Sequence, residues 1–567
     1  MQKFTLLMIG LVFSASALAV ERANPTNALI IDRPSAERPE LPKYVPKEMP
    51  SFKLPPVNKV LLHRNEDTVK IQLNGIQFIG NTVIDETELQ AIAKPFIGKA
   101  ATVADLEDLR QRVSQYYLEQ GYVNSGAVLP DQQFKNGIIT MQIIEGKLSE
   151  IRVQGTEWLE PSYISDRLYD HDEQEVLNVN VLRENFQQLL LDPLIDQMNG
   201  SLLPSSQRGE SILDVNVVRA RPYQLTLTAD NYQPPSIGST VGHLGGWVRN
   251  LTGLGDMLSG SVAYSEGLIG GSGSYSIPLN AQNTRFHFYI DRNDTTIIEQ
   301  TLQPLDIRSR YVNVDFGLTH PFINSLNRNF NVGISFNYKK NRTSMLNEPF
   351  DFSEGSVNGI TKDSVLRFTL DFTERFEKQV LSVRSTTSVG INAFDATWHK
   401  NSALPDGNFV SWLGQLQYGA QLFDSDANIV LRGDVQYSDN KLMPLERFAL
   451  GGRYSVRGYR ENQLVRDKGY ALSAELRYPL LKDDSEYNLG TVTIFPFMDY
   501  GAAQNRGDRK NIVHLYSVGM GLEWQLSKQF STELIYAHAL NRPPQVPKAD
   551  YDLQDSGFQW RVNFSAF

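Results

Sequence analysis

The stretch Phe330-Asn331-Val332-Gly333-Ile334-Ser335-Phe336-Asn337-Tyr338-Lys339 alternates apolar and polar side chains along its whole length. Successive side chains of a β-strand point to opposite faces of the sheet, so this stretch predicts a strand with one apolar and one polar face. The same alternation recurs at residues 285–290, 311–318 and 470–478. Repeated strand after strand, this pattern is what a wall between lipid and water requires.

The alternation replaces helical periodicity from residue 222 to the end of the chain. An open sheet edge in hydrocarbon would leave backbone groups unpaired at several kcal/mol each, so a membrane sheet must close on itself. At roughly 20 residues per strand with its connections, residues 222–567 predict an all-β transmembrane barrel of about 16 antiparallel strands. A large soluble sandwich is the alternative, but the aromatic content of 28 Phe, 24 Tyr and 6 Trp favours the barrel.

Composition and charge exclude several classes of protein. The 567 residues carry a formal charge of −10, which makes a general nucleic-acid binder a poor fit. Beyond the first residues no uncharged apolar run approaches the ~18 residues of a membrane-spanning helix. The chain contains no Cys, which suits an oxidising compartment where a stray thiol would be a hazard.

The N-terminal region divides into three segments that precede any globular pattern. Residues 1–19 are typical of a signal peptide, because a lysine, an apolar run and a small-residue cleavage site follow one another. Residues 20–33 predict a short helix that could act as a mobile plug, capped by Asn24 with Pro25 at its first position and containing Ala28-Leu29-Ile30-Ile31-Asp32. Residues 34–68 form a proline-rich linker, and a disordered leader is the alternative for both segments.

Two small α+β modules are expected between the linker and the barrel. Residues 69–146 show the order strand, helix, helix, strand, strand, and residues 147–221 repeat that order less clearly. The repetition predicts a tandem pair of similar modules. Their position after a signal peptide and before a membrane barrel predicts that they lie in the periplasm.

Two motifs in the barrel region carry a family resemblance. Val456-Arg457-Gly458-Tyr459 resembles the sixth-loop tip of the polypeptide-transport-associated superfamily of outer-membrane proteins, and Phe497-Met498-Asp499-Tyr500-Gly501 resembles its partner strand. Two modules, a short helix and a linker make the chain similar to the TpsB branch, the two-partner secretion transporters. The terminal Phe567 departs from the usual C-terminal signal, because it is one residue out of register with the preceding alternation.

The resemblance implies a function and a site. It implies that an unfolded large exoprotein, such as a haemolysin, an adhesin or a contact-dependent inhibition toxin, docks on the modules and crosses the barrel without ATP. It also implies that Asp499 points into the lumen and pairs with Arg457. A guanidinium and a carboxylate can form two charge-assisted hydrogen bonds, Gly458 would permit a tight tip, and Tyr459 would add an apolar face. The pair could simply hold the loop in place, but the position of the loop determines how open the pore is.

No catalytic residue, metal site or cofactor is expected, because the sequence lacks HExxH, CxxC and GxSxG motifs and its 8 histidines are scattered. We therefore expect a transporter rather than an enzyme, located in the outer membrane of a Gram-negative bacterium. Its expected partners are the exoprotein and outer-membrane lipid, with no nucleic acid, and we expect a monomer. A barrel-assembly factor is the main alternative function, and a passive porin is a third.

Overall fold

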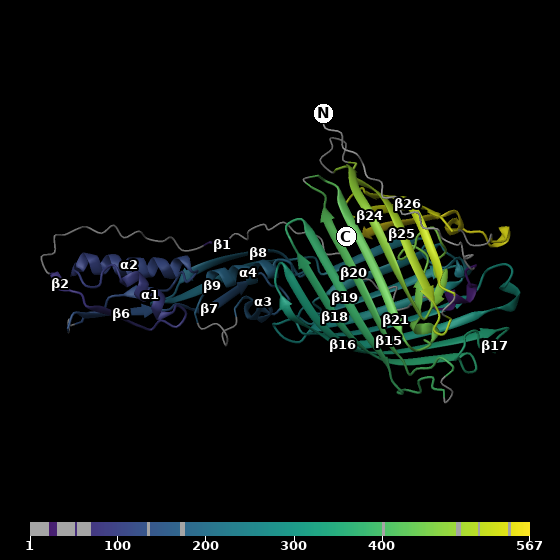
Figure 1. The fold of residues 1–567 in the computed structure, drawn as a ribbon, viewed down its shortest axis with the longest axis horizontal. Coiled ribbons are helices and arrows are strands. Elements are labelled where there is room, and N and C mark those ends of the chain that lie inside the picture. Colours follow the sequence, from purple (N-terminus) through teal and green to yellow (C-terminus); the bar gives the residue numbers. More distant parts are fainter. Residues whose placement is uncertain are drawn as a thin grey trace.

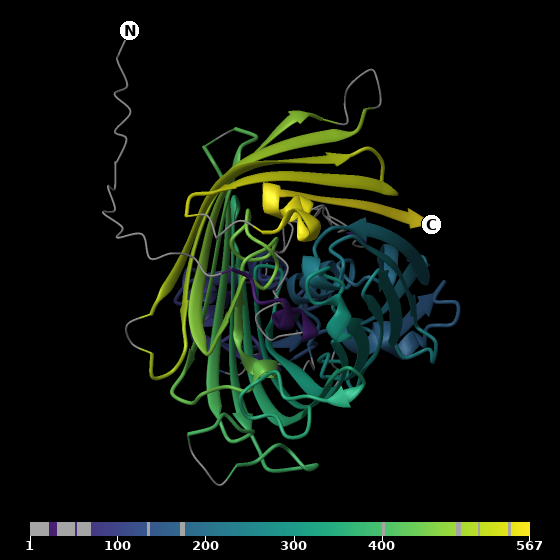
Figure 2. The same cartoon turned by 90° about the vertical axis from the view of Figure 1, so that its right-hand side faces the viewer.

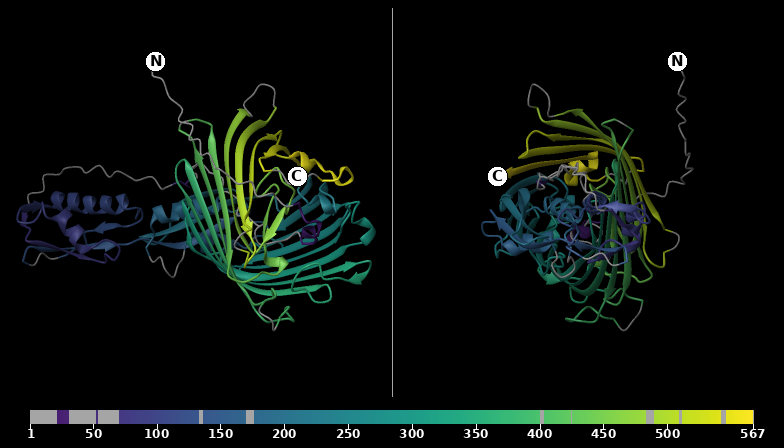
Figure 3. Two further views of the ribbon diagram at one scale, coloured as in Figure 1. Left: turned by 45° about the vertical axis from the view of Figure 1, so that its right-hand side comes forward. Right: turned by 90° about the vertical axis from the view of Figure 1, so that its left-hand side faces the viewer.

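The computed structural model describes residues 22–30, 52–53, 70–132, 136–169, 176–399, 403–423, 425–482, 489–508, 511–541 and 546–566. Two consecutive α/β modules extend from one end of a closed barrel (Figures 1 and 3). The expected signal peptide, Ile31, Asp32, most of the linker and Phe567 lie outside the described residues. No helix within the described ranges is both long and apolar enough to cross a membrane.

Module 1 packs two helices against a small sheet. Strand β3 runs parallel to β6, and β5 pairs antiparallel with β6. A reciprocal capping box between Thr102 and Asp105 starts the longer helix, whose apolar side then supplies the core with Leu106, Leu109 and Val113. The elements are β2 (Lys70–Gln72), β3 (Gly75–Ile79), α1 (Glu86–Ala93), β4 (Ala100–Thr102), α2 (Val103–Glu119), β5 (Gly126–Val128) and β6 (Ile138–Ile144).

Module 2 has the same core topology, with β7 parallel to β9 and β8 antiparallel to β9. Its elements are β7 (Lys147–Gln154), α3 (Pro161–Leu168), α4 (Val179–Leu189), β8 (Ile195–Pro204) and β9 (Glu210–Arg219). The sequence patterns indicated only a linker at residues 34–68 and so missed one strand of this module. Within that segment β1 (Phe52–Lys53) pairs in parallel with Gly200 and Ser201 of β8 and extends the sheet of module 2. An extended backbone beside an open strand edge offers the hydrogen bonds that make this addition possible.

The barrel consists of 16 antiparallel strands, as predicted, and it closes where β10 pairs with β28. The two-residue β17 (Glu348–Pro349) belongs to a loop hairpin on β16. The wall strands are β10 (Tyr223–Asp230), β11 (Val241–Arg249), β12 (Met257–Ser265), β13 (Leu268–Pro278), β14 (Arg285–Thr296), β15 (Arg308–Asn324), β16 (Arg328–Met345), β18 (Ile360–Arg375), β19 (Gln379–Gly390), β20 (Val410–Gln421), β21 (Asn428–Ser438), β24 (Lys468–Leu481), β25 (Thr491–Gln504), β26 (Val513–Gln525), β27 (Phe530–Ala539) and β28 (Phe558–Ala566).

The alternation of apolar and polar residues sets the two faces of this wall. On neighbouring strands Phe316, Leu318 and Ile334 are 43–46% exposed on the outside. Asn313 and Asn337 point to the other face, are almost fully buried, and hydrogen bond to each other across the strands. An apolar exterior and a polar interior are the arrangement of a transmembrane barrel.

The connection between β21 and β24, residues 439–467, is the sixth on the side opposite the modules, and we call it loop six. It contains the 3-10 turn η5 (Pro444–Glu446) and a hairpin of β22 (Phe448–Leu450) and β23 (Leu464–Arg466). Residues 451–463 form the tip of that hairpin. Further short 3-10 turns lie in other connections on the same side, η3 (Pro235–Ile237), η4 (Gln303–Leu305), η6 (Lys548–Asp550) and η7 (Leu553–Ser556).

Candidate functional site

Loop six carries its own small apolar core against the inner wall of the barrel. Val456, Leu450 and Tyr459 pack with Ala503 and Leu515, which come from β25 and β26. Val456, one of the predicted site residues, is completely buried there. Burial of these side chains gives a loop inside a wet lumen the apolar contacts it needs to stay in one place.

Arg457 lies at the centre of the polar contacts of the tip. Its Nε and Nη2 donate to the two carboxylate oxygens of Asp499 at 2.7 Å each, and its backbone N–H donates to Asp499 at 3.1 Å. The guanidinium also lies 3.4 Å from the ring centroid of Phe497. The structure therefore brings Arg457 and Asp499 together in a two-pronged pair, and Arg457 is only 2% exposed.

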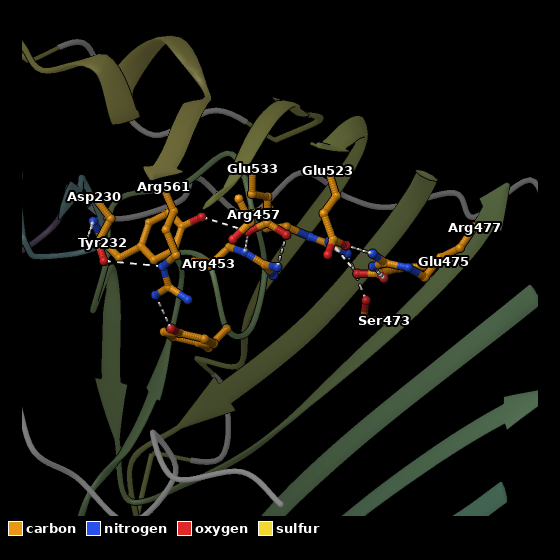
Figure 4. A network of polar contacts seen from close by, with 12 residues as sticks. Asp230, Tyr232, Arg453, Arg457, Ser473, Glu475, Arg477, Glu523, Glu533 and Arg561 are labelled. Atoms are coloured by element: carbon orange, nitrogen blue, oxygen red, sulfur yellow. Dashed lines mark hydrogen bonds and ion pairs between the residues drawn. The ribbon is translucent and has the colours of Figure 1, made fainter. Parts of the chain in front are cut away.

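Glu475 is a second carboxylate, which the sequence analysis did not select. It accepts hydrogen bonds from Arg457 at 2.7 Å and from Arg477 at 3.1 Å (Figure 4). Arg432 donates a further hydrogen bond to it at 2.7 Å. Ser473, two residues earlier on β24, accepts from Arg457 at 2.9 Å. A signal for this group was present in the sequence, because Ser473, Glu475 and Arg477 alternate with apolar residues and therefore share the inner face of one strand.

Gly458 and Tyr459 shape the tip where it meets β27. Gly458 has φ +88°, and a Cβ there would lie 3.0 Å from the carbonyl oxygen of Ala537, so both the backbone and the space favour glycine. The Tyr459 hydroxyl donates to the Tyr516 carbonyl at 2.9 Å and also contacts Asn541. Burial raises the pKa of Tyr459 to about 12, so its hydroxyl stays protonated at neutral pH.

A second chain of contacts links loop six to the seam where the barrel closes. Arg453 donates two hydrogen bonds to Glu533 of β27 at 2.8 and 2.9 Å, and Tyr232 donates to the same carboxylate at 2.8 Å (Figure 4). Arg561 of the last strand lies over the Tyr232 ring and 3.4 Å from Asp230 of the first. Although burial alone would lower the pKa of Arg453, the charge of Glu533 raises it above its ordinary value.

Arg460 joins loop six to two other loops on the side opposite the modules. It donates to Asp555 at 2.7 and 2.8 Å and to Glu299 at 2.8 Å. Its Nη2 also donates to the Asp550 carbonyl at 2.7 Å. All three arginines of the tip are therefore paired with carboxylates that lie outside loop six.

The expected helix of residues 20–33 is shorter than predicted. It is a 3-10 helix, η1 (Pro25–Leu29), capped by the Asn24 side chain as expected, but Ile30 is already extended with φ −134°. The described helix therefore ends at Leu29, and residues 31–33 of the predicted helix lie outside the described residues. Thr26, Asn27 and the β-branched Ile30 have weak helix propensity, and Ser309 donates to the Leu29 carbonyl that a continuing helix would use.

The short helix η1 nevertheless lies within the ring of strands, as seen from the end opposite the modules (Figure 2). Ala28 and Leu29 are buried among Ile237, Leu268 and Ile307, and Ile30 packs with Tyr311 and Leu445 of loop six. Asn27 also donates to the Asn462 carbonyl of loop six at 3.2 Å. The helix and the loop thus contact each other inside the barrel.

The site consists of ion pairs, aromatic contacts and small apolar clusters. Within the described residues, no three His, Asp or Glu side chains are grouped so that they could hold a metal ion. This arrangement holds a loop and a helix in the lumen through non-covalent contacts. A closed barrel with α/β modules at one end and an anchored loop inside is the architecture that the motif resemblance predicted.

Comparison with known proteins gives the family. The model of the haemolysin secretion/activation protein ShlB/FhaC/HecB family matches residues 209–524, and that of the ShlB-type POTRA domain matches residues 71–146. The chain belongs to the ShlB/FhaC/HecB family, the TpsB transporters of two-partner secretion, and is an outer-membrane transporter. Proteins of this family are transporters rather than enzymes.

Individual relatives match over most of their length. The chain is 24% identical to the heme/hemopexin transporter protein HuxB of Haemophilus influenzae over 557 residues, covering 94% of each chain. It is 23% identical to the outer membrane transporter CdiB of Dickeya dadantii, covering 79% of each. The solved structure of CdiB from Escherichia coli superposes with a TM-score of 0.67 at 19% identity, covering 90% of this chain and 93% of that one.

Proposed function

We propose that this transporter exports one large exoprotein, which it receives unfolded in the periplasm and passes through its own barrel. The observation that carries this proposal is the occupied lumen, where loop six and η1 contact each other through one hydrogen bond and a small apolar cluster. A permanently open porin has no use for such contacts. Relatives whose names refer to heme/hemopexin, to Cdi and to hemolysin transport support a large secreted cargo.

The modules would make the first contact with the cargo. An extended segment can add to an exposed sheet edge, with main-chain hydrogen bonds providing the affinity. The sheet orders are β3-β6-β5 in module 1 and β1-β8-β9-β7 in module 2. Since β1 already covers the outer edge of β8, the proposal favours β7 in module 2 and either edge strand of module 1.

The resting transporter would be closed by two elements, η1 and the tip of loop six. Arg457 would keep the tip on the inner wall through Asp499 and Glu475, and Ala28 and Leu29 would keep η1 among the loops. Cargo binding would shift this closed state toward an open one. Folding of the cargo outside the cell would prevent its return, so no nucleotide is needed. We further propose that the transporter acts as a monomer surrounded by outer-membrane lipid.

Removal of both modules tests the proposal. A variant lacking residues 69–221 should still form a barrel but should export none of the exoprotein encoded beside it. The measurement is the amount of exoprotein in the medium, with heat-modifiable gel mobility as the control for barrel folding. Undiminished export by this variant would contradict the proposal. A general loss of other outer-membrane barrels on depletion of the full chain would instead favour the barrel-assembly alternative.

A further inference from the structure

A polar cavity of about 520 Å³ lies where module 2 meets the barrel, within the ~300–1,000 Å³ range of ligand sites. One side is formed by α4 of module 2 and the segment that follows it, including Gln188 and Asp192. The other side is formed by the ends of β14, β15, β16 and β18 nearest the modules. The cavity therefore lies at the mouth of the barrel on the side where module 2 meets it.

The wall residues of this cavity belong to the inner face of the barrel. On β15, Leu318 is 43% exposed on the outside, so the adjacent Thr319, which lines the cavity, points inward. On β14, Phe288 and Ile290 face outward, which places Arg285 on the inner face. Because the barrel residues that line the cavity face the lumen and not the membrane, a lipid headgroup is a poor candidate for its occupant.

Three arginines line the cavity, and within the described part of the chain none of them forms a salt bridge. Arg167 donates to the Asn280 carbonyl and the Asn283 side chain, and Arg375 donates to the Asn329 side chain at 2.7 Å. Arg285 makes no side-chain hydrogen bond that the described residues account for.

The same lining offers little negative charge. Among its described residues the only acidic side chain is Asp192, which already accepts hydrogen bonds from the Tyr163 hydroxyl and from the Leu194 backbone. This local excess of positive charge is unusual in a chain whose formal charge is −10. Arginines elsewhere in the barrel, such as Arg453 and Arg457, are matched with carboxylates.

Burial lowers the pKa of Arg167, and the neighbouring Tyr163 and Asp192 offset that lowering only in part. An uncompensated guanidinium in a partly buried cavity favours an anionic occupant, because a carboxylate can accept two of its hydrogen bonds. The charge of the lining therefore selects for a carboxylate-bearing ligand.

Six carboxamide side chains complete the lining, Asn185, Gln188, Asn283, Asn324, Asn329 and Asn331. A carboxamide has both a donor and an acceptor, so it can bind either group of a peptide backbone without reading its sequence. Arginines combined with carboxamides therefore suit an extended polypeptide that carries acidic side chains. Several of these carboxamides already hydrogen bond to one another or to the arginines, as Asn329 does to Asn324 and to Arg375, so a peptide backbone that binds there would exchange these bonds for its own.

The polar surface continues farther into the barrel. A second cavity of about 360 Å³ also includes Thr319 in its lining and contains Arg367 and Arg384 on the inner face of β18 and β19. These two arginines are paired, with Glu446 and with Asp371 respectively. The unpaired charges are thus concentrated at the mouth, where a cargo segment would be captured first, and not along its whole path.

We propose that this cavity is a cargo-binding site, in which Arg285, Arg375 and Arg167 bind acidic side chains of an extended exoprotein segment as it leaves module 2. The inference rests on the proposed export function and adds the site and the chemistry of its ligand. Arg285 is the residue to test, because no hydrogen bond or salt bridge among the described residues depends on its side chain. Arg167 also joins module 2 to the barrel, so its replacement would disturb more than binding.

The first test measures binding to the purified full chain in detergent. The probe is a fluorescent, disordered peptide of alternating Asp and Gly, and its comparison is the isosteric peptide of Asn and Gly. We expect the Asp peptide to bind at least about 10-fold more tightly, and Arg285→Gln to remove most of that preference. Thr319→Glu should also remove most of the preference for the Asp peptide. Residue 319 faces Arg285 across the strands, so a glutamate there would supply the missing carboxylate.

The matched control is Arg328→Gln. Arg328 lies at the end of β16 nearest the modules, but it is paired with Glu374 and its side chain is 52% exposed. It should leave the peptide affinity unchanged. Equal affinity of the two peptides, or equal weakening by Arg328→Gln and Arg285→Gln, would overturn the inference.

The second test measures export of the neighbouring exoprotein by the same variants. If the unaltered chain exports and Arg285→Glu lowers export at least about 10-fold while Arg328→Gln does not, the site is supported. If the unaltered chain exports and Arg285→Glu exports equally well, this inference fails while the proposed function stands. If the unaltered chain exports nothing, the proposed function fails, and the inference that rests on it fails too.

Discussion

The arginines on the inner wall of the barrel fall into two groups, those paired with carboxylates and those without a salt bridge. At β24–β27, Arg457 meets both Asp499 and Glu475, and Arg453 meets Glu533. At the ends of β14–β18 nearest the modules, Arg285 and Arg375 line an open cavity and form no salt bridge with any described residue. The arginines of the first group have carboxylate partners inside the molecule, which explains their presence on the inner wall. The arginines of the second group have no such partner, so we expect their carboxylate partners to come from a bound ligand.

The paired and the unpaired arginines also differ in how much their replacement should cost in folding free energy. A buried arginine with two carboxylates leaves an unpaired charge when one partner is removed, at ~3–5 kcal/mol. A half-exposed arginine without a partner can be replaced at little cost to folding, because water already solvates it. Substitutions in the loop-six wall should therefore affect the closed state of the transporter, and substitution of Arg285 at the mouth should affect cargo binding alone.

The largest effect is expected for Arg457→Ala, because it leaves charged side chains without their partner at β24–β27, as is already the case at the ends of β14–β18. It leaves Asp499 and Glu475 without their shared partner and should release the tip of loop six. We expect export to fall more than about 10-fold while the barrel still shows heat-modifiable gel mobility. Arg432→Ala is the control, because it also removes a hydrogen bond to Glu475 but lies on the wall, so export should fall much less. Normal export by Arg457→Ala would argue against a role for loop six.

The next largest effect is expected for Leu29→Asp, which acts on η1 instead of the ion pairs. A carboxylate placed among Ile237, Leu268 and Ile307 would lose its hydration and should expel the helix from the lumen. Single-channel conductance in planar bilayers should rise. Thr26→Asp, in the same helix but outside that apolar cluster, should leave the current unchanged. An unchanged current with Leu29→Asp would show that η1 does not restrict the pore.

A smaller effect is expected for Gly458→Ala, with Gly507→Ala as its control. Both glycines have φ +88°, so both substitutions impose a similar backbone strain of ~1–3 kcal/mol. Only the Cβ at position 458 would meet the wall, 3.0 Å from the Ala537 carbonyl, whereas nothing lies within 4 Å at position 507. Protease cleavage within loop six should therefore increase for Gly458→Ala only. Equal cleavage of the two variants would mean that contact with the wall contributes nothing.

The smallest effect concerns the titration of Tyr459. Its pKa of about 12 in the folded chain exceeds the ordinary value of ~10, so its contribution to stability is complete below pH ~10. That contribution is lost as the pH rises through about 12, when the buried hydroxyl ionises. Protection of loop six from protease should fall over this interval in the unaltered chain and be flatter in Tyr459→Phe. Identical pH profiles for the two proteins would show that Tyr459 does not control the loop.

Much of the architecture could be predicted from local sequence patterns. The period of two predicted the faces of the barrel, because it depends on neighbouring residues only. The length of the alternating region, divided by the residues that one strand and its connections need, predicted the number of strands. The Arg457 and Asp499 motifs were identified by resemblance. Glu475 was missed because its inner-face position does not by itself distinguish a lumenal glutamate that pairs from one that does not. The end of η1 at Leu29 was also missed, because the contacts with Ser309 and Leu268 come from distant strands.

The mouth cavity could not be predicted at all. Its arginines at positions 167, 285 and 375 come from module 2 and two separate strands, and their lack of carboxylate partners is a property of the assembled molecule. Likewise the pairing of residues 52–53 with β8 depends on a strand edge that lies far along the chain. Local patterns carry no information about either feature.

The central claim is that the cargo crosses the lumen of this barrel, and crosslinking during export tests it most directly. A photoreactive residue at position 319 would point into the lumen, and one at the adjacent position 318 would point to lipid. We predict that the exoprotein is captured from position 319 and not from position 318 while export is under way. Capture from position 318 alone, or equally from both positions, would contradict passage through the lumen.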